Sequence, residues 1–244
     1  MGISRTVTVY EGPGGPFEGM AVTDSAAAAG SLPGILLIPN VLGTKEADFV
    51  TAEEVASLGY AALVADIYGQ GKRATHADPD LARFMLPLNA DRQLLKARLE
   101  SSLAALKAMP QVDPAKTAAI GFCFGGKCVL DMVRGGLDIL AGVSFHGVYD
   151  SPPFANVTPI KPKLLVCHGW EDPLCPPEAV IALGQEMTEG GADWQIHAYG
   201  GTGHAFTDKM LKGQPPLRPG FGYHEDSDRR SWKAMQDFLA ELFA

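Results

Sequence analysis

Short apolar runs recur along the chain, and most are separated by stretches in which apolar residues have helical spacing. An unbroken apolar run is typical of a strand that is buried on both faces, as in a parallel sheet. Residues 34–39, Gly-Ile-Leu-Leu-Ile-Pro, are the first such run. Further strands are predicted at residues 60–65, 140–145, 163–168 and 194–199 and at a run that starts at residue 118, after an opening hairpin of residues 6–10 and 18–23.

Amphipathic stretches between these runs predict helices. Residues 46–57 have apolar positions near helical spacing, and the Gly59 that follows suits a helix end. Residues 89–109 place leucines on one face and charged side chains on the other. Further helices are predicted directly after residue 123, at residues 177–188 and at residues 227–243. Since parallel neighbouring strands need a crossover connection, this alternation predicts an α/β fold with a doubly wound, mainly parallel sheet and helices on both faces.

Length, charge and cysteine spacing narrow the class of protein. The 244 residues are 46% hydrophobic and contain no dividing linker, so we expect a single domain over residues 1–244. The formal net charge of -8 leaves no basic stripe for phosphates, which argues against nucleic acid as a partner. No apolar run approaches the roughly 20 residues of a membrane span, and the chain start lacks the apolar core of a secretory signal. We therefore expect a cytoplasmic protein without membrane attachment, whose four cysteines are reduced because none are paired as Cys-x-x-Cys.

Residues 118–127 combine an apolar strand, a Gly-x-Cys-x-Gly-Gly turn and the start of a helical pattern. This is the outline of a nucleophile elbow, in which the nucleophile occupies a strained corner between a strand and a helix. Glycines flank such a corner because a Cβ atom there would collide with neighbouring backbone. The pattern predicts that Cys123 is a thiol nucleophile. The alternative is a small buried hydrophobe, as free cysteines often are.

Two further reactive groups follow other predicted strands. Asp172 follows the strand that ends at residue 168, and His204 follows the strand that ends near residue 199. Because ligands gather at the carboxyl ends of parallel strands, Cys123, Asp172 and His204 are expected at one edge of the sheet, in the chain order of α/β-hydrolases. His204 would accept the thiol proton and later protonate the leaving group, and Asp172 would orient the imidazole. Taken singly, Asp172 is equally a turn cap and His204 a loop residue.

Acyl transfer also needs hydrogen-bond donors for the developing oxyanion. In this fold the backbone N–H after the nucleophile supplies one, and the loop after the third strand supplies the other. These positions are Phe124 and Val41, the latter in the short apolar segment 39–43. The alternative for that segment is an ordinary turn from a strand to a helix.

The remaining histidines and the glycine-rich segment do not predict a metal or cofactor site. His146 and His168 also end strands and are expected to be packed and hydrogen-bonded, and the alternative is that they line the pocket. A metal centre needs three or four ligands at recognisable spacing, and the sequence has no such set. Residues 121–126 lack the Gly-x-Gly-x-x-Gly order of dinucleotide sites, so no cofactor is expected.

Three segments carry a further resemblance: residues 121–126, Gly-Phe-Cys-Phe-Gly-Gly; residues 168–173, His-Gly-Trp-Glu-Asp-Pro; and residues 203–206, Gly-His-Ala-Phe. They are similar to the three signature regions of the dienelactone hydrolase family, and the similarity covers nearly the whole chain. The resemblance implies a single-domain α/β-hydrolase fold and a triad of Cys123, Asp172 and His204. It also implies cleavage of lactones and related esters without a cofactor.

The sequence departs from that family at two places. The family's best-studied type has a glutamate that engages the cysteine in the loop after the third strand, whereas Asn40 is the matching residue here. That type also has an arginine shortly after the histidine, which holds the substrate carboxylate, and here Thr207 and Asp208 occupy the region. If Asp208 faces the pocket, it would repel a carboxylate and favour a neutral or cationic ester, lactone or thioester. The other residues expected at the pocket are Arg83, as a compensating charge, and the apolar walls Tyr149, Trp170 and Phe206. The alternatives are a solvated surface arginine and aromatic side chains that belong to the core.

The leading functional hypothesis is a carboxylic ester or lactone hydrolase that acts on a small molecule through an acyl-cysteine intermediate, as a monomer or homodimer. A glutamine amidotransferase also uses a Gly-x-Cys-x-Gly elbow, but it pairs the elbow with a histidine and a glutamate separated by one residue. His224 and Glu225 are adjacent here. A third hypothesis is a binding or redox-sensing protein in which Cys123 is a responsive thiol.

Overall fold

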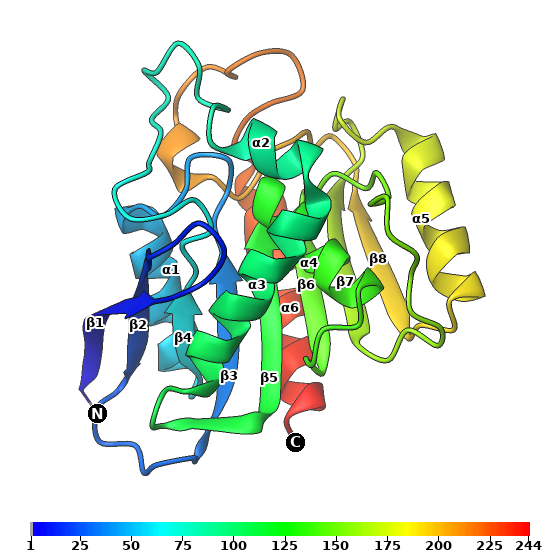
Figure 1. Ribbon diagram of the computed structural model, residues 1–244. Helices are drawn as coiled ribbons and strands as arrows, with labels where there is room; N and C mark the ends of the chain where they lie inside the picture. The colour runs from blue at the N-terminus through cyan, green and yellow to red at the C-terminus, as the bar shows by residue number, and fades with distance from the viewer. Residues whose placement is uncertain (1) are drawn as a thin grey trace.

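One eight-stranded sheet organises the chain, as the computed structural model of residues 2–244 shows (Figure 1). In spatial order its strands are β1 (Ile3–Tyr10), β2 (Phe17–Asp24), β4 (Ala61–Val64), β3 (Leu32–Ile38), β5 (Val112–Phe122), β6 (Ala141–Phe145), β7 (Lys163–Gly169) and β8 (Trp194–Tyr199). β2 pairs antiparallel with both β1 and β4, and all other neighbours are parallel. The mainly parallel α/β sheet predicted from the sequence is confirmed.

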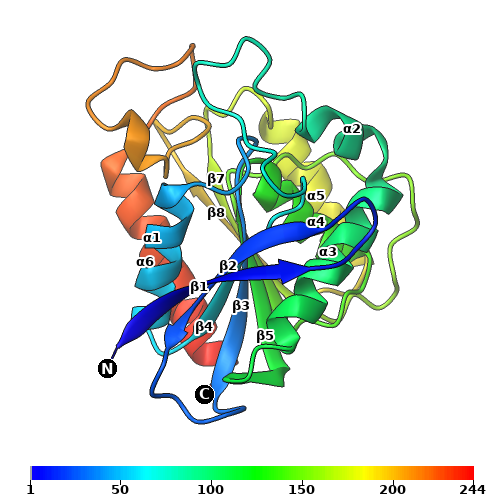
Figure 2. The same ribbon diagram turned by 60° about the vertical axis from the view of Figure 1, so that its left-hand side comes forward.

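Helices cover both faces of this sheet (Figure 2). One face carries α1 (Glu46–Ser57) and α6 (Glu225–Leu242), and the other carries α3 (Arg92–Lys107), α4 (Phe124–Arg134) and α5 (Pro177–Glu189). The short α2 (Met85–Ala90) and a 3-10 turn at Lys209–Leu211 lie in connecting segments. Within residues 2–244, no helix has both the length and the apolar character needed to cross a membrane.

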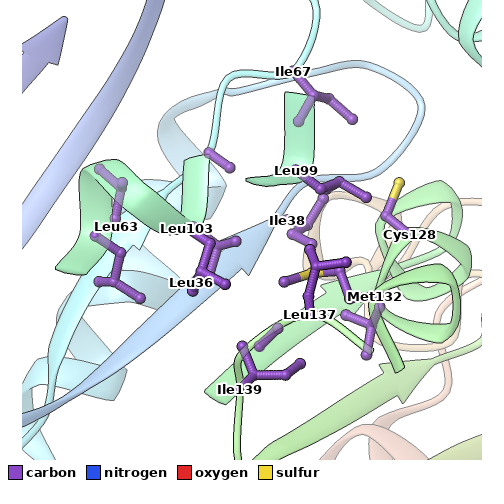
Figure 3. Close-up of a cluster of buried hydrophobic side chains, with 14 of the residues drawn as sticks. Leu36, Ile38, Leu63, Ile67, Leu99, Leu103, Cys128, Met132, Leu137 and Ile139 are labelled. Carbon is purple, nitrogen blue, oxygen red and sulfur yellow. The ribbon is translucent and has the colours of Figure 1, made fainter. Parts of the chain in front are cut away.

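Alternate residues of the central strands face the two helical layers, which is why these strands are unbroken apolar runs. In β3, Leu36 and Ile38 pack in a cluster with Leu99 of α3 (Figure 3). Ile35 and Leu37 of the same strand belong to the cluster that α1 and α6 cover. All four β3 side chains are fully buried. The strand therefore joins the two halves of the core.

The observed helices differ from the predicted ones mainly before α3. The helix predicted at residues 89–109 begins at Arg92, because the carboxylate of Asp91 accepts a hydrogen bond from the backbone N–H of Leu94 at 2.9 Å and caps the helix. The residues before this cap form the separate six-residue α2. This helix was not predicted, because six residues with an internal Pro87 are too few to show apolar positions at helical spacing.

Strands β5 to β8 are consecutive parallel neighbours, so their carboxyl ends lie at one edge of the sheet. The segments that leave these four ends carry, in order, Cys123, His146, Asp172 and His204. Loops at this edge can vary without disturbing the packed sheet, and ligand sites of such folds form here. The fold thus gathers four reactive side chains from four different strand ends.

Candidate active site

Cys123 lies at the corner between β5 and α4, in a backbone conformation with φ of 55°. A positive φ is unfavourable for a residue with a Cβ atom, and such strain is typical of functional sites. The neighbouring glycines allow the corner to form. A Cβ on Gly121 would lie 2.1 Å from the carbonyl oxygen of Gly125, and one on Gly125 would lie 2.1 Å from that of Ile38. The corner between strand and helix that the sequence predicted is therefore present.

His204 lies in the loop after β8 and contacts Asp172, which follows β7. The Nδ1 atom of His204 is 2.7 Å from Oδ2 of Asp172, and both side chains are buried. The other carboxylate oxygen of Asp172 accepts a hydrogen bond from the backbone N–H of Leu174 at 2.8 Å. The backbone N–H of His204 donates to the carbonyl of Gly220 at 2.7 Å. The imidazole is thus held through both its ring and its backbone.

Cys123 and His204 are close enough to shift each other's pKa in opposite directions. Burial raises the pKa of the Cys123 thiol, but the positive charge of His204, a hydrogen bond from its ring and two backbone N–H groups together outweigh burial, so this pKa lies below its ordinary value. Burial by itself lowers the pKa of His204, but the Cys123 thiolate and the Asp172 carboxylate raise it to about 10. Both the charge of the His204 ring and its hydrogen bond to the sulfur contribute to these shifts. These opposite shifts favour a thiolate and an imidazolium over a neutral pair.

Two backbone N–H groups also lower the pKa of the Cys123 thiol. They belong to Phe124, the first residue of α4, and to Val41 in the loop after β3. That loop reaches the elbow because Gly125 places no side chain against the end of β3. The side-chain oxygen of Asn40 accepts a hydrogen bond from the backbone N–H two residues further on, at 3.0 Å, and fixes the loop. The two N–H groups predicted as oxyanion donors therefore lie beside the sulfur.

A cavity of about 920 Å³ opens beside these groups, which is large enough for a small-molecule ligand. Cys123 and His204 line it, as do Val41 and Phe124 with their backbone N–H groups. Asn40, which was predicted for the pocket, lines it as well. Among residues 2–244, no cluster of three or more histidine, cysteine or acidic side chains is arranged to hold a metal ion.

Charges of both signs line this cavity, and most are paired. The ammonium group of Lys45 is 2.7 Å from Asp48, and that of Lys209 is 3.1 Å from Glu54. Asp208 lines the cavity as well. The sequence predicted that Asp208 in this position would repel a substrate carboxylate. Acidic and basic groups are equal in number, so the cavity has no strong net charge. The charged lining residues are Lys45, Asp48, Glu54, Lys127, Asp208, Lys209, Arg218 and Asp228.

Four residues predicted to line the pocket lie elsewhere. Arg83 donates hydrogen bonds to backbone carbonyls of its own loop region and pairs with the carboxylate of Asp78 at 3.4 Å. The hydroxyl of Tyr149 is buried 2.8 Å from Nδ1 of His168, and Phe206 is fully buried in the core layer of α1 and α6. Trp170 is 43% exposed and does not line the cavity. All four lie in loops near the sheet edge, but their sequence positions do not determine which way each side chain points.

His146 was predicted to be packed and hydrogen-bonded, with lining the pocket as the alternative, and the structure shows both. It is buried, lines the cavity and accepts a hydrogen bond from the backbone N–H of Cys123 at 3.1 Å. Within residues 2–244 the non-glycine residues with positive φ are Cys123, His146 and Ala205, and all three line the cavity. The one signal in the sequence was that His146 ends a predicted strand at the same sheet edge.

Comparison with known proteins agrees with the sequence motifs. An uncharacterised protein of Caenorhabditis elegans is 39% identical over 160 residues, which are 62% of this chain and 95% of that protein. A solved dienelactone hydrolase-like promiscuous phosphotriesterase from metagenomic libraries is 31% identical, with a TM-score of 0.87 and 98% of both chains covered. A second solved structure, designated m3DLH, is 33% identical, with a TM-score of 0.89 and 99% of both chains covered. The family model named "Dienelactone hydrolase family" matches residues 17–243, so this chain belongs to the dienelactone hydrolase family.

Proposed function

We propose that this protein hydrolyses carboxylic esters or lactones through an acyl-cysteine intermediate on Cys123. The observation that carries the proposal is the position of Cys123 at a strained corner beside a cavity of about 920 Å³ that His204 also lines, with Asp172 2.7 Å from the His204 ring. The opposite pKa shifts of Cys123 and His204 favour a thiolate and an imidazolium at this position. A thiol in this state is a nucleophile at neutral pH. The proposed setting is the cytoplasm, where thiols stay reduced.

In the first half-reaction the Cys123 thiolate attacks the carbonyl carbon and forms a carbon–sulfur bond. The carbonyl electron pair moves to oxygen, and the N–H groups of Phe124 and Val41 stabilise the resulting oxyanion. These donors face the sulfur at rest, and they become free for the oxyanion once the sulfur has lost its charge. As the oxyanion collapses, the carbon–oxygen bond to the leaving group breaks, and His204 gives its Nε2 proton to that oxygen.

In the second half-reaction a water molecule enters the cavity and attacks the thioester. Neutral His204 takes a proton from this water, and Asp172 stabilises the imidazolium that forms. Collapse of the second oxyanion breaks the carbon–sulfur bond and releases the carboxylic acid. The thiolate and imidazolium pair is restored without any further reactant.

The proposed substrate is uncharged near the reacting carbonyl, because Asp208 would repel an added carboxylate. We expect Asp208→Asn to raise kcat/KM for an anionic ester by about fivefold, which corresponds to about 1 kcal/mol of charge repulsion, and to leave a neutral ester of the same shape nearly unchanged. Steady-state kinetics on the matched pair of esters measures this. Asp226→Asn removes an exposed charge of α6 that does not line the cavity and should change neither value. Equal responses of the two esters to Asp208→Asn would contradict this substrate class.

The pH dependence of alkylation should reveal the thiolate of Cys123. Because its pKa lies below the ordinary thiol value, reaction with iodoacetamide should remain fast below about pH 8.5 and slow only as pH falls through the lowered pKa. The reaction should be selective, because burial raises the pKa of Cys128, Cys167 and Cys175. The rate of mass gain as a function of pH measures this. A profile centred on the ordinary thiol pKa would contradict the proposed ion pair.

Turnover of uncharged aryl esters and small lactones by the purified protein tests the proposed function. We expect multiple turnovers with at least one ester class, and no release of ammonia from glutamine. Ammonia release without ester turnover would favour the amidotransferase hypothesis. Failure of every ester and lactone, with an unmodified Cys123, would favour the binding or redox-sensing hypothesis.

A second candidate activity, hydrolysis of phosphotriesters, is supported by the solved phosphotriesterase that is 31% identical over 98% of both chains. A thiolate beside two N–H donors suits attack at a neutral phosphorus centre as well as at carbon. Release of an aryl alcohol from a neutral aryl phosphotriester, lost in Cys123→Ala, would establish it.

A further inference from the structure

His146 contacts the backbone of Cys123 and lies beside the ring of His204. It leaves the end of β6, and its backbone N–H donates to the carbonyl of Cys167 in β7 at 2.9 Å. The residue is 2% exposed and lines the cavity, and its ring centroid lies 5.1 Å from that of His204 in an edge-to-face arrangement. His146 is thus a buried imidazole at the reaction centre that takes no part in the proton transfers.

Hydrogen bonds at both ring nitrogens fix the tautomer of His146. Its Nδ1 accepts from the backbone N–H of Cys123 at 3.1 Å. A backbone N–H can only donate, so Nδ1 carries no proton and the proton of the neutral ring is on Nε2. Nε2 lies 2.8 Å from Oγ1 of Thr207 and donates to it. Burial and the positive charge of His204 lower the pKa of His146 well below its ordinary value, so the ring stays neutral.

We infer that His146 is a positioning residue that joins the nucleophile elbow to the loop that carries His204. One nitrogen of its ring holds the backbone of Cys123, and the other holds Thr207, three positions after His204. The elbow follows β5 and the loop follows β8, and β6 and β7 separate these strands. We call this connection, from the backbone of Cys123 through the His146 ring to Thr207, the bridge. The bridge sets the distance between the sulfur of Cys123 and Nε2 of His204. Only the predicted effect of the bridge on ester turnover rests on the proposed function.

Backbone strain coincides with the bridge. The φ angle is 55° at Cys123, 38° at His146 and 61° at Ala205, the residue after His204. Strained conformations of this kind persist only where the surrounding structure enforces them. The N–H of Cys123 also lies 3.0 Å from the carbonyl of Phe145, so it keeps a hydrogen-bond partner when His146 is replaced. Loss of the bridge should therefore change the relative position of the pair more than it changes folding.

Thr207→Val tests the bridge at its far end, because it removes the hydroxyl and keeps the shape of the side chain. We expect kcat for a neutral aryl ester to fall about tenfold, as for a reacting group displaced by a fraction of an ångström, with KM nearly unchanged. Thr207→Ser keeps the hydroxyl and should restore kcat. The alkylation rate of Cys123 at low pH, relative to its plateau, should fall in Thr207→Val, because a less closely held imidazolium lowers the thiol pKa less.

His146→Asn tests the bridge at its centre. Asparagine tolerates a positive φ and keeps an acceptor near the position of Nδ1, but it is too short to reach Thr207. His146→Asn should therefore lower kcat by the same factor as Thr207→Val. The double variant should lose no more kcat than either single variant, because both changes break the same connection. Thr23→Val is the matched control, since Thr23 is a buried threonine of β2 whose hydroxyl has no partner within residues 2–244. It should leave kcat and the alkylation profile unchanged.

Wild-type kcat and a wild-type alkylation profile in both Thr207→Val and His146→Asn would overturn the inference. So would a loss that Thr207→Ser does not restore, losses that add in the double variant, or a lowered melting temperature with both readouts unchanged. Alkylation of Cys123 needs no ester turnover, so it tests the bridge separately from the proposed function. A wild-type protein that hydrolyses no ester would count against the proposed function alone.

Discussion

Cys123→Ala is expected to lower kcat for a neutral aryl ester by on the order of 10⁴-fold or more. Without the sulfur no acyl intermediate forms, and only the N–H donors and the cavity contribute to the reaction. His204→Ala should cost a similar factor, because the thiolate and the leaving-group proton both depend on its charge. The double variant should be no slower than the slower single variant, since the two residues act as a unit. Rates of aryl alcohol release measure these effects.

Cys128→Ala provides the matched control for this result. Cys128 is a fully buried cysteine of α4, five positions after Cys123, and it does not line the cavity. Its replacement should leave kcat nearly unchanged. Full activity in Cys123→Ala would show that Cys123 takes no part in the reaction. Equal losses of kcat in both variants would show that the substitutions disrupt α4 and do not report on the nucleophile.

Gly125→Ala is expected to destabilise the protein by about 4 kcal/mol or more, at the upper end of single substitutions. Its Cβ would lie 2.1 Å from the carbonyl oxygen of Ile38 and 2.6 Å from that of Pro39. Both atoms belong to backbone at the end of β3, so no flexible side chain can move aside. Either α4 or the loop of Val41 must shift, which separates the elbow from a proposed oxyanion donor. Denaturant unfolding and kcat should therefore both show a loss.

Gly200→Ala is the control for this change, because no heavy atom lies within 4 Å of the Cβ it would add. We expect its free energy of unfolding to stay within about 0.5 kcal/mol of wild type. A Gly125→Ala protein as stable as Gly200→Ala would contradict the close approach of β3 to the elbow.

The sheet could be predicted because its central strands are buried on both faces and therefore appear as apolar runs. β3 shows this most clearly, with Leu36 and Leu37 on opposite faces and both fully buried. The helix boundary at Asp91 could not be located, because a capping aspartate within a polar stretch has no period of its own. α2 was missed for the same physical reason, since it is too short to show an amphipathic pattern.

The grouping of Cys123, Asp172 and His204 could be predicted because each follows the carboxyl end of a parallel strand. The pocket walls could not, because a loop side chain can turn toward the cavity or the core. Phe206 shows the difficulty: it comes two residues after His204, yet it packs against the rings of Tyr199 and His146 with no exposed surface. The connection made by His146 depends on its tautomer and its neighbours in space, neither of which local sequence encodes.

Intact mass after brief exposure to an activated neutral ester tests the acyl-cysteine chemistry most directly. We expect a gain of one acyl group, found by peptide mapping on Cys123 and lost again as water completes the reaction. Cys123→Ala should gain no such group under the same conditions. A wild-type protein that turns over the ester while the acyl group is found only on another residue would contradict Cys123 as the nucleophile.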